Sequence, residues 1–290
     1  MASLKEIRSR ISSVSSTRKI TSAMKMVSAA KLKKAQNTIE NSLRYQQKMT
    51  DILYGFISST ENDAASPVSE MRAAKRIAII AVTSDSSLCG AFNNNIIKLF
   101  KETYNEYAGK LGSENIDIYP IGKKMVAAVH KMELSSIETG IEMTDKLDFA
   151  PIAAFMNKLM QEFVEQKIDE VIVIYNHFKN AGVQVPTKET LLPFAAPKQE
   201  SDTANVDYIV EPGKKELVED LIPKVIRMQL YSILQDSLAA EHGARTTAMQ
   251  IATENADELV QELTLNYNKL RQAAITTEII TIIGGAEAIK

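Results

Sequence analysis

One polar loop in the sequence has the residue types and the position for chemistry. The loop Ser84–Gly90 directly follows the apolar run Ile77–Val82, and open α/β sheets bind ligands beyond the carboxyl ends of such strands. Cys89, near the start of a helical stretch, could act as a nucleophile if its pKa were lowered there. No His or Lys lies beside it in the sequence to activate it. We therefore favour a packed turn residue, since single buried Cys residues are common.

Other catalytic and ligand-binding patterns are missing from the sequence. It contains neither G-x-x-x-x-G-K-[ST] nor G-x-G-x-x-G, the two common nucleotide motifs. A single Cys excludes an intramolecular disulfide framework and a Cys-rich metal site. The three histidines, His130, His177 and His242, have no metal-binding spacing. We therefore expect no catalytic residues, no cofactor and no bound metal, and the lack of any run of 18 apolar residues predicts no membrane span.

The formal net charge of −2 conceals a strongly basic N-terminal segment. Residues 1–58 hold 11 Lys and Arg against Glu6, Glu40 and Asp51, a net charge of +8. Such a segment is compatible with nucleic-acid binding, with a mitochondrial targeting peptide, or with a helix lying in an acidic protein cavity. Against nucleic-acid binding, the segment has no exposed aromatic residues interleaved with its Lys and Arg. Against a targeting peptide, its helical pattern continues without a break at which a presequence would be removed. The cavity interpretation agrees best with a long helix that its own chain cannot cover.

The hydrophobic pattern predicts two long helices, in residues 1–58 and 213–290. Leu4, Ile7, Ile11 and Val14 form one helical stripe in the first. In the second, eight of twelve heptad core positions are apolar. These positions are the pairs Gln235/Leu238, His242/Arg245, Met249/Ala252, Ala256/Leu259, Leu263/Asn266 and Leu270/Ala273. We predict that the two helices form an antiparallel coiled coil.

Residues 75–195 alternate between strand and helix patterns. Strands are expected at Ile77–Val82, Ile116–Ile121 and Glu170–Tyr175, with shorter edge strands at Val183–Val185 and Thr190–Phe194, and helices at 91–107, 123–132 and 149–166. This alternation is typical of a small α/β domain with a mostly parallel sheet. The predicted fold is a Rossmann-like α/β domain without a nucleotide motif, joined to the coiled coil, with residues 196–212 as a polar linker.

The C-terminal end of the second helix is unusually apolar. Eight of the nine residues in Ile275–Ile283 are Ile or Thr. Intrinsic propensity favours a strand, but continuity with the heptads favours a helix that is apolar nearly all round. Because little of the chain is available to cover it, we expect another protein to bury this tip.

Three motifs in chain order resemble the ATP synthase gamma subunit, the central rotor shaft of the F-type enzyme, in its bacterial form. They lie at residues 18–31, at 84–93 and at 271–286. The resemblance covers the whole chain from residue 3. Two positions depart from the family pattern: Thr281 replaces a usual acidic residue, and Ser87 replaces a common glycine.

The resemblance implies a non-catalytic subunit of the proton-transporting ATP synthase. The coiled coil would rotate inside a ring of alternating alpha and beta subunits, couple proton flow through the membrane c-ring to ATP synthesis, and regulate ATPase activity. The epsilon subunit and the c-ring would be further partners, with no nucleic acid and with membrane contact only through the c-ring. Because the resemblance begins at residue 3 and leaves no room for a transit peptide, we expect a peripheral protein on the cytoplasmic face of a bacterial inner membrane.

The resemblance also implies roles for individual residues. Rotor–stator contacts would be Met24, Lys25, Arg271, Gln272, Thr276 and Glu278, with Met24 and Lys25 close to the level of Arg271. Tyr208 and Glu211 would meet the c-ring, and Asp85, Leu88 and Cys89 would form a loop on the epsilon side. The rival functions are a basic coiled-coil nucleic-acid-binding protein and a small α/β enzyme with its ligand at the loop of Asp85 and Cys89.

Overall fold

The computed structural model describes residues 3–58, 67–144, 147–194 and 213–288. The chain forms two compact units, Ala29–Arg245 and the paired segments Met1–Ser28 and Thr246–Lys290. The two long helices, α1 (Leu4–Ser58) and α5 (Lys214–Ala288), each contribute to both units.

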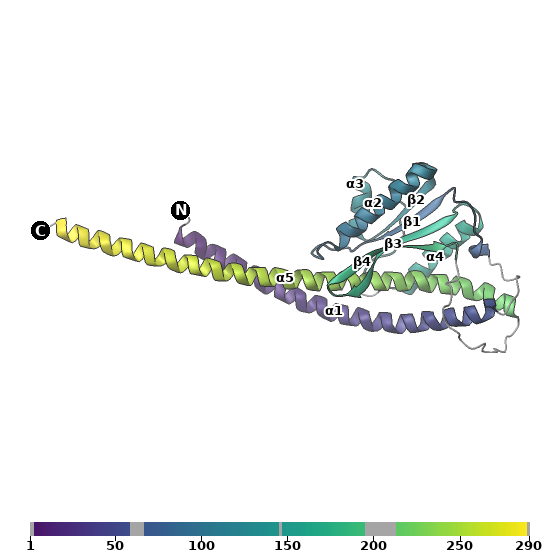
Figure 1. Ribbon diagram of the computed structural model, residues 1–290, viewed down its shortest axis with the longest axis horizontal. Coiled ribbons are helices and arrows are strands. Elements are labelled where there is room, and N and C mark those ends of the chain that lie inside the picture. Colours follow the sequence, from purple (N-terminus) through teal and green to yellow (C-terminus); the bar gives the residue numbers. More distant parts are fainter. Residues whose placement is uncertain (1–2, 59–66, 145–146, 195–212, 289–290) are drawn as a thin grey trace. The chain divides into compact units, whose positions relative to one another are not determined.

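A four-stranded sheet lies at the centre of the unit Ala29–Arg245 (Figure 1). Its strand order is β2 (Ile116–Ile121), β1 (Ile77–Val82), β3 (Glu170–Asn180) and β4 (Val183–Leu192). Strand β1 pairs in parallel with β2 and β3, whereas β4 runs antiparallel to β3. The predicted mostly parallel sheet of a small α/β domain is confirmed.

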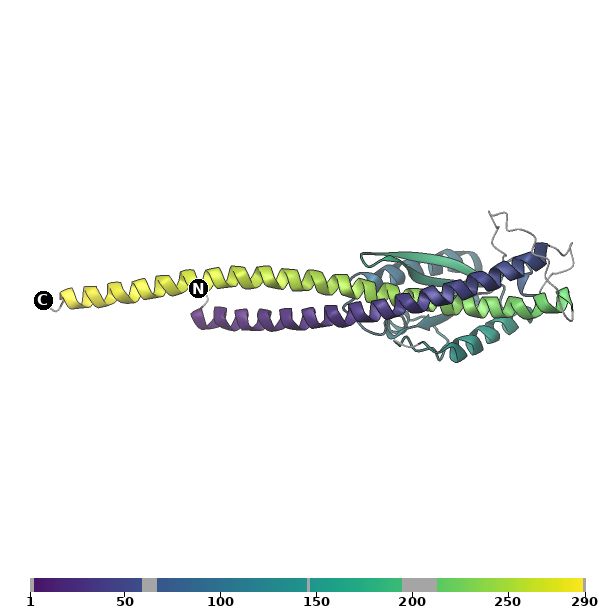
Figure 2. The ribbon, with the colours of Figure 1, turned by 90° about the horizontal axis from the view of Figure 1, so that it is seen from below.

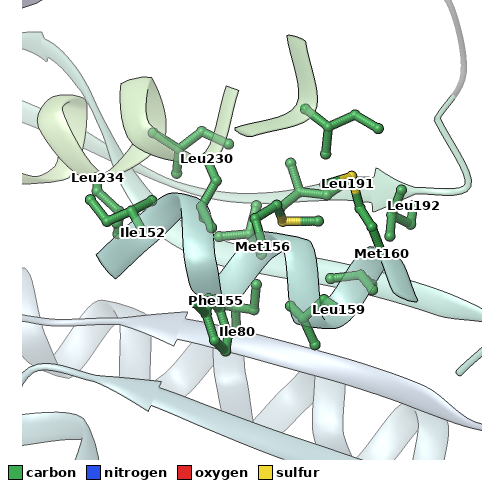
Figure 3. Packing of buried hydrophobic residues seen from close by; sticks show 14 of the residues in the cluster. Ile80, Ile152, Phe155, Met156, Leu159, Met160, Leu191, Leu192, Leu230 and Leu234 are labelled. Atoms are coloured by element: carbon green, nitrogen blue, oxygen red, sulfur yellow. The ribbon is translucent and has the colours of Figure 1, made fainter. Parts of the chain in front are cut away.

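Helices cover both faces of this sheet. On one face, α2 (Phe92–Leu111) and α3 (Lys123–Lys131) pack on alternate residues of β1, such as Ile77 and Ile79. On the other face, α4 (Phe149–Val164) and α5 pack around Ile80, and Figure 3 shows Met156 and Leu230 in this layer. All six β1 residues are buried, as expected for a parallel strand covered on both sides. Two 3₁₀ turns, η1 (Pro67–Ser69) and η2 (Ser113–Asn115), complete the described elements.

The antiparallel edge of the sheet corrects one prediction. Val183–Val185 and Thr190–Phe194 are expected as separate short strands, but β4 is continuous from Val183 to Leu192. Pro186 lies inside it, opposite Asn176 of β3. A proline is tolerated there because β4 is at the sheet edge, where a missing N–H need not cost a ladder hydrogen bond. Strand β3 likewise extends beyond the predicted Tyr175, to Asn180.

In the helical unit, the start of α1 runs antiparallel to residues 246–271 of α5 (Figure 2). Arg18 Nη1 donates to Asp257 Oδ1 at 2.7 Å, and Lys25 Nζ donates to Gln250 Oε1 at 2.5 Å. Residue numbers therefore rise along one helix while they fall along the other. The predicted antiparallel pairing is confirmed within this unit.

The seam of the pair differs from the predicted heptad in one respect. On α1, Leu4, Ile7, Ile11 and Val14 are buried or half-buried, as expected. On α5, the seam holds Val260, Tyr267 and Ala274, which are half-buried, whereas the predicted Leu259, Asn266 and Ala273 are exposed. In the last three of these heptads the second core position is therefore one residue later than predicted, because the partner helix selects which of two adjacent side chains faces it.

Candidate functional site

The loop after β1 caps the first turn of α3. Asp85 Oδ1 accepts a hydrogen bond from the backbone N–H of Lys123 at 2.9 Å, and Thr83 Oγ1 accepts one from Met125 N at 2.8 Å. The backbone enters α3 through Gly122, at φ 91° and with its α-carbon so close to Thr83 that an added Cβ would lie 2.2 Å from the Thr83 carbonyl oxygen. A helix N-terminus is a natural anion site, and the Asp85 carboxylate fills it from within the chain.

The three predicted loop residues have different environments. Cys89 is buried, and its Sγ accepts a hydrogen bond from Asn93 Nδ2 at 3.2 Å. Asp85 is half-buried, and its carboxylate is hydrogen-bonded to the N-terminus of α3. Leu88 alone of the three presents an exposed side chain, 56% accessible, on a backbone at φ 68° that is rare for a residue other than glycine.

Side chains fill the place where an open α/β sheet receives a ligand. That place is the crevice beyond the carboxyl ends of β1 and β3, because β2 and β3 lie on opposite sides of β1. There Asn176 Nδ2 donates to the Phe92 carbonyl oxygen at 3.0 Å. Phe92 and Cys89 pack with Ala240 and Ala244 of α5. The packed-turn interpretation of Cys89 agrees with this contact, which joins the loop to α5.

An ion pair on α5 also holds this loop, and the sequence analysis did not single it out. Arg245 Nη2 lies 2.7 Å from Glu241 Oε1 and donates to Ser86 Oγ at 2.6 Å. The side chains of Arg245 and Glu241 are only 10% and 7% exposed. Their i,i+4 spacing on a helix is a visible signal for a pair, but no local pattern indicates that Ser86 lies against it.

Polar side chains form the seam of the helical unit beyond Val14. The hydroxyl of Thr253 donates to that of Thr21 at 2.8 Å, between the Arg18–Asp257 pair and the Lys25–Gln250 pair. Lys25 and Met24 are both half-buried. The seam is thus apolar near the start of α1 and hydrogen-bonded farther along.

The predicted rotor–stator residues on α5 lie far from those on α1. Lys25 faces Gln250, whereas Arg271 is 21 residues farther along α5, or about 30 Å at 1.5 Å per residue. The prediction that Met24 and Lys25 lie close to the level of Arg271 is therefore wrong. Counting back the same 21 residues on α1 from Lys25 reaches Leu4, so Arg271 marks the level at which α1 begins.

Beyond Arg271, α5 continues with little cover from the described chain. Arg271, Gln272, Thr276 and Glu278 are all exposed and share one helix. The hydroxyl of Thr276 donates back to the Gln272 carbonyl oxygen at 2.9 Å, a local bond within the helix. Ile275–Ile283 is helical, as continuity with the heptads predicts, and its isoleucines are exposed.

The remaining predicted contacts, Tyr208 and Glu211, and the predicted linker 196–212 lie outside the described residues. Among the residues that are described, no helix is long and apolar enough to cross a membrane. The same residues contain no group of three or more His, Cys, Asp or Glu side chains arranged to hold a metal ion.

Comparison with known proteins identifies the family. The family model for ATP synthase matches residues 3–289. The ATP synthase gamma chain of Bacteroides fragilis is 50% identical over 99% of this chain and 100% of its own length. The chain belongs to the ATP synthase gamma chain family. As a gamma chain, it is a subunit of the ATP synthase complex, and this favours ATP synthesis and ion transport over the nucleic-acid-binding alternative.

Solved structures share the fold of this gamma chain at low sequence identity. The rotor of the Euglena gracilis mitochondrial ATP synthase aligns with a TM-score of 0.63 and 19% identity, over 94% of this chain and 98% of that one. A second structure of the same enzyme, containing OSCP, F1 and the c-ring, gives a TM-score of 0.64 and 18% identity, over 99% of this chain and 94% of that one. The predicted combination of an α/β domain with two long terminal helices is confirmed by this likeness.

Proposed function

We propose that this gamma chain is the non-catalytic central rotor of its ATP synthase. It turns inside a ring of alternating alpha and beta subunits and couples proton flow through the c-ring to ATP synthesis. By the same contacts it regulates ATPase activity. Its place is the cytoplasmic face of a bacterial inner membrane, where it reaches the membrane only through the c-ring.

One observation carries the proposal: the last part of α5 is a solitary helix covered with large aliphatic side chains. Ile279, Ile280, Ile282 and Ile283 are between 50% and 70% exposed. Each such side chain gains roughly 1.5–3 kcal/mol when it is moved out of water. A helix of this composition is therefore expected inside a sleeve of another protein, and an apolar surface can turn there without breaking fixed ion pairs.

The polar residues that precede this apolar segment are suited to hydrogen-bond with the surrounding subunits. Arg271 and Gln272 have exposed side chains where the paired helices end, and an Arg makes strong, directional hydrogen bonds to carboxylates. We assign one group of rotor–stator contacts to Arg271, Gln272, Thr276 and Glu278. A separate contact is assigned to Met24 and Lys25, at the level of Gln250 on α5.

Other partners are assigned by position in the chain. Leu88 is exposed on the loop that Asp85 and Cys89 anchor, so the epsilon subunit is expected to touch this loop through Leu88. Tyr208 and Glu211 are assigned to the c-ring. The Euglena structures that share the fold are described as a rotor and as an assembly with F1 and the c-ring, which supports the c-ring as a partner.

The proposal is tested by purifying the tagged chain from its native membranes and assaying the eluate for ATPase activity. Alpha- and beta-like subunits should co-purify with activity. Replacing Arg271 and Gln272 together by Ala should lower the activity about tenfold, the effect of losing one charge-assisted hydrogen bond of about 1.5 kcal/mol in the rate-limiting state.

A matched control replaces Lys269 and Asn266 by Ala, which removes one charge and one amide from exposed positions on the same helix. This control should keep its activity. A chain that purifies alone, or that brings down only nucleic acid, contradicts the rotor function. Equal losses in the two double variants contradict the specific contact at Arg271 and Gln272 while leaving the rotor function in place.

A further inference from the structure

A cavity in the unit Ala29–Arg245 has a lining that the rotor function does not use. It has a volume of about 190 Å³ and lies between α1, the strands β3 and β4, and α5. Two carboxylates line it, Glu189 and Asp236, and none of the described lining residues is Lys or Arg. The lining is therefore acidic, with His177 as its one basic side chain.

Two buried oxygen atoms in this lining have no hydrogen-bond partner among the described residues. They are Oγ of Ser232, a residue only 8% exposed, and Oε1 of Gln46. A buried polar atom without a partner costs roughly 1–3 kcal/mol, so native proteins usually satisfy such atoms. Gln46 Oε1 can only accept a hydrogen bond, which means that its partner must be a donor.

Within the described residues, the hydrogen-bond donors to the Glu189 carboxylate are both neutral. Tyr175 Oη donates to Glu189 Oε2 at 3.2 Å, and Gln229 Nε2 donates to Oε1 at 3.0 Å. Burial, together with the nearby Glu189 charge, raises the pKa of Tyr175, so its phenol stays a protonated donor. Lys188, the nearest cation in sequence, turns instead to Glu106. Among the described lining residues, no Lys or Arg pairs with the Glu189 charge, and the one basic side chain, His177, lies against Asp236.

The hydrogen-bond partners of Asp236 are of a different kind. Its Oδ2 lies 2.6 Å from His177 Nδ1, and its Oδ1 accepts the backbone N–H of Phe178 at 3.2 Å. Burial raises the pKa of Asp236 above its ordinary value, although both of these bonds favour the charged form. Each carboxylate thus has two hydrogen bonds, but only Asp236 has a basic side chain, His177, among its donors, so Glu189 is the better partner for a cation.

We propose that this cavity binds a protonated primary amine. An alkylammonium group has three N–H donors, which match the Glu189 carboxylate, the Gln46 carbonyl and the Ser232 hydroxyl. Its positive charge balances Glu189, and its alkyl stem lies against Ile39 and Ile233, the apolar part of the lining. The amine is either a free small molecule or a lysine side chain of a partner subunit.

The test titrates the purified full-length chain with n-butylammonium chloride and follows binding by saturation-transfer NMR. Tetramethylammonium chloride, a cation without N–H donors, keeps the ionic strength constant. The wild-type chain should bind butylammonium with a dissociation constant on the order of 1–10 mM, as expected for a ligand of so few atoms. The variant Glu189→Gln should bind at least tenfold more weakly.

Two further variants separate the site from general charge and folding effects. Glu165→Gln removes a half-exposed carboxylate outside the cavity and should leave the affinity unchanged. Ser232→Ala should weaken amine binding about threefold and yet raise the midpoint of thermal unfolding of the free chain, because it removes a buried hydroxyl without a partner. Absence of binding at 50 mM, equal binding of tetramethylammonium, or unchanged affinity in Glu189→Gln overturns the proposal.

The same titration on the assembled complex identifies the source of the amine. Binding that survives assembly indicates a free small molecule. Binding that is present in the free chain and lost in the complex indicates that a partner's lysine fills the cavity. Because the measurement on the free chain does not depend on rotation or ATPase activity, its failure leaves the proposed function untouched.

Discussion

Two runs of similar aliphatic composition have opposite environments in this chain. In β1, every residue from Ile77 to Val82 is fully buried between helical layers. Near the end of α5, the isoleucines between Ile275 and Ile283 are 48–70% exposed. Composition alone does not decide burial; what decides it is whether the same chain supplies a covering layer. The central unit carries its own cover, and the helical unit presents a surface suited to a cover from elsewhere.

The largest effect on the isolated chain is expected from a buried ion pair in the central unit. Asp169 bonds to Arg72 Nε at 2.5 Å and accepts the backbone N–H groups of Lys75 and Arg76. The two side chains are 10% and 17% exposed. Asp169→Asn leaves the Arg72 charge buried without a counterion and should lower the free energy of unfolding by about 3 kcal/mol at pH 7, measured by urea titration.

This effect should depend on pH with a defined sign. Burial by itself raises the pKa of Asp169, but the bonds from Arg76 N, Lys75 N and Arg72 outweigh it and hold the pKa below its ordinary value of 3.8. A lowered pKa in the folded state contributes stability above the ordinary value, and this contribution is lost as the pH falls through the folded-state value. The difference between wild type and Asp169→Asn should therefore shrink below about pH 4. A constant difference from pH 7 to pH 3 argues against a charged Asp169.

A smaller effect is expected in the polar seam of the helical unit. Thr253→Val removes the hydrogen bond between the two hydroxyls and leaves Thr21 with only its local bond to the Arg18 carbonyl oxygen. It should cost about 1 kcal/mol, seen as roughly fivefold faster hydrogen exchange of the α1 amides around Thr21. Thr21→Val combined with Thr253→Val should restore protection, because both members of the pair are then apolar. If the double variant exchanges faster than the single one, the hydroxyl pair is not the unit of stability in this seam.

The smallest effect on the isolated chain is expected at the tip. Ile279→Ser with Ile283→Ser changes two exposed side chains and should alter the free energy of unfolding by no more than about 0.5 kcal/mol. In the assembled complex the same variant should lose ATPase activity at least tenfold, because the buried aliphatic contacts of the tip are gone. A large loss of stability in the free chain would show that the tip is already covered by its own chain.

Local pattern was enough for the elements that depend on local physics. The branched apolar run Ile77–Val82 predicts a doubly covered strand, and Leu4, Ile7 and Ile11 predict the seam of α1; the structure has both. These predictions are correct because the backbone geometry of a single helix or strand sets the spacing at which its side chains face the same side.

Features set by distant residues were not predictable in the same way. Pro186 suggests a break in the edge strand, and only the position of β4 at the sheet edge makes it tolerable. Leu259 and Val260 are both apolar, and the partner helix decides that Val260 faces the seam. The placement of Met24 and Lys25 relative to Arg271 required the register of the pair, which no single helix contains.

The capping of α3 by Asp85 has a consequence for how the domain responds to the cell. Related open α/β sheets place a ligand's phosphate at such a helix end, and the stability of a ligand-dependent fold rises and falls with the ligand concentration. Here the anion is a side chain of the same polypeptide, so its effective concentration never changes. The stability of this domain is thereby independent of the nucleotide supply, a useful property if the chain, as we propose, transmits torque both when ATP is abundant and when it is scarce.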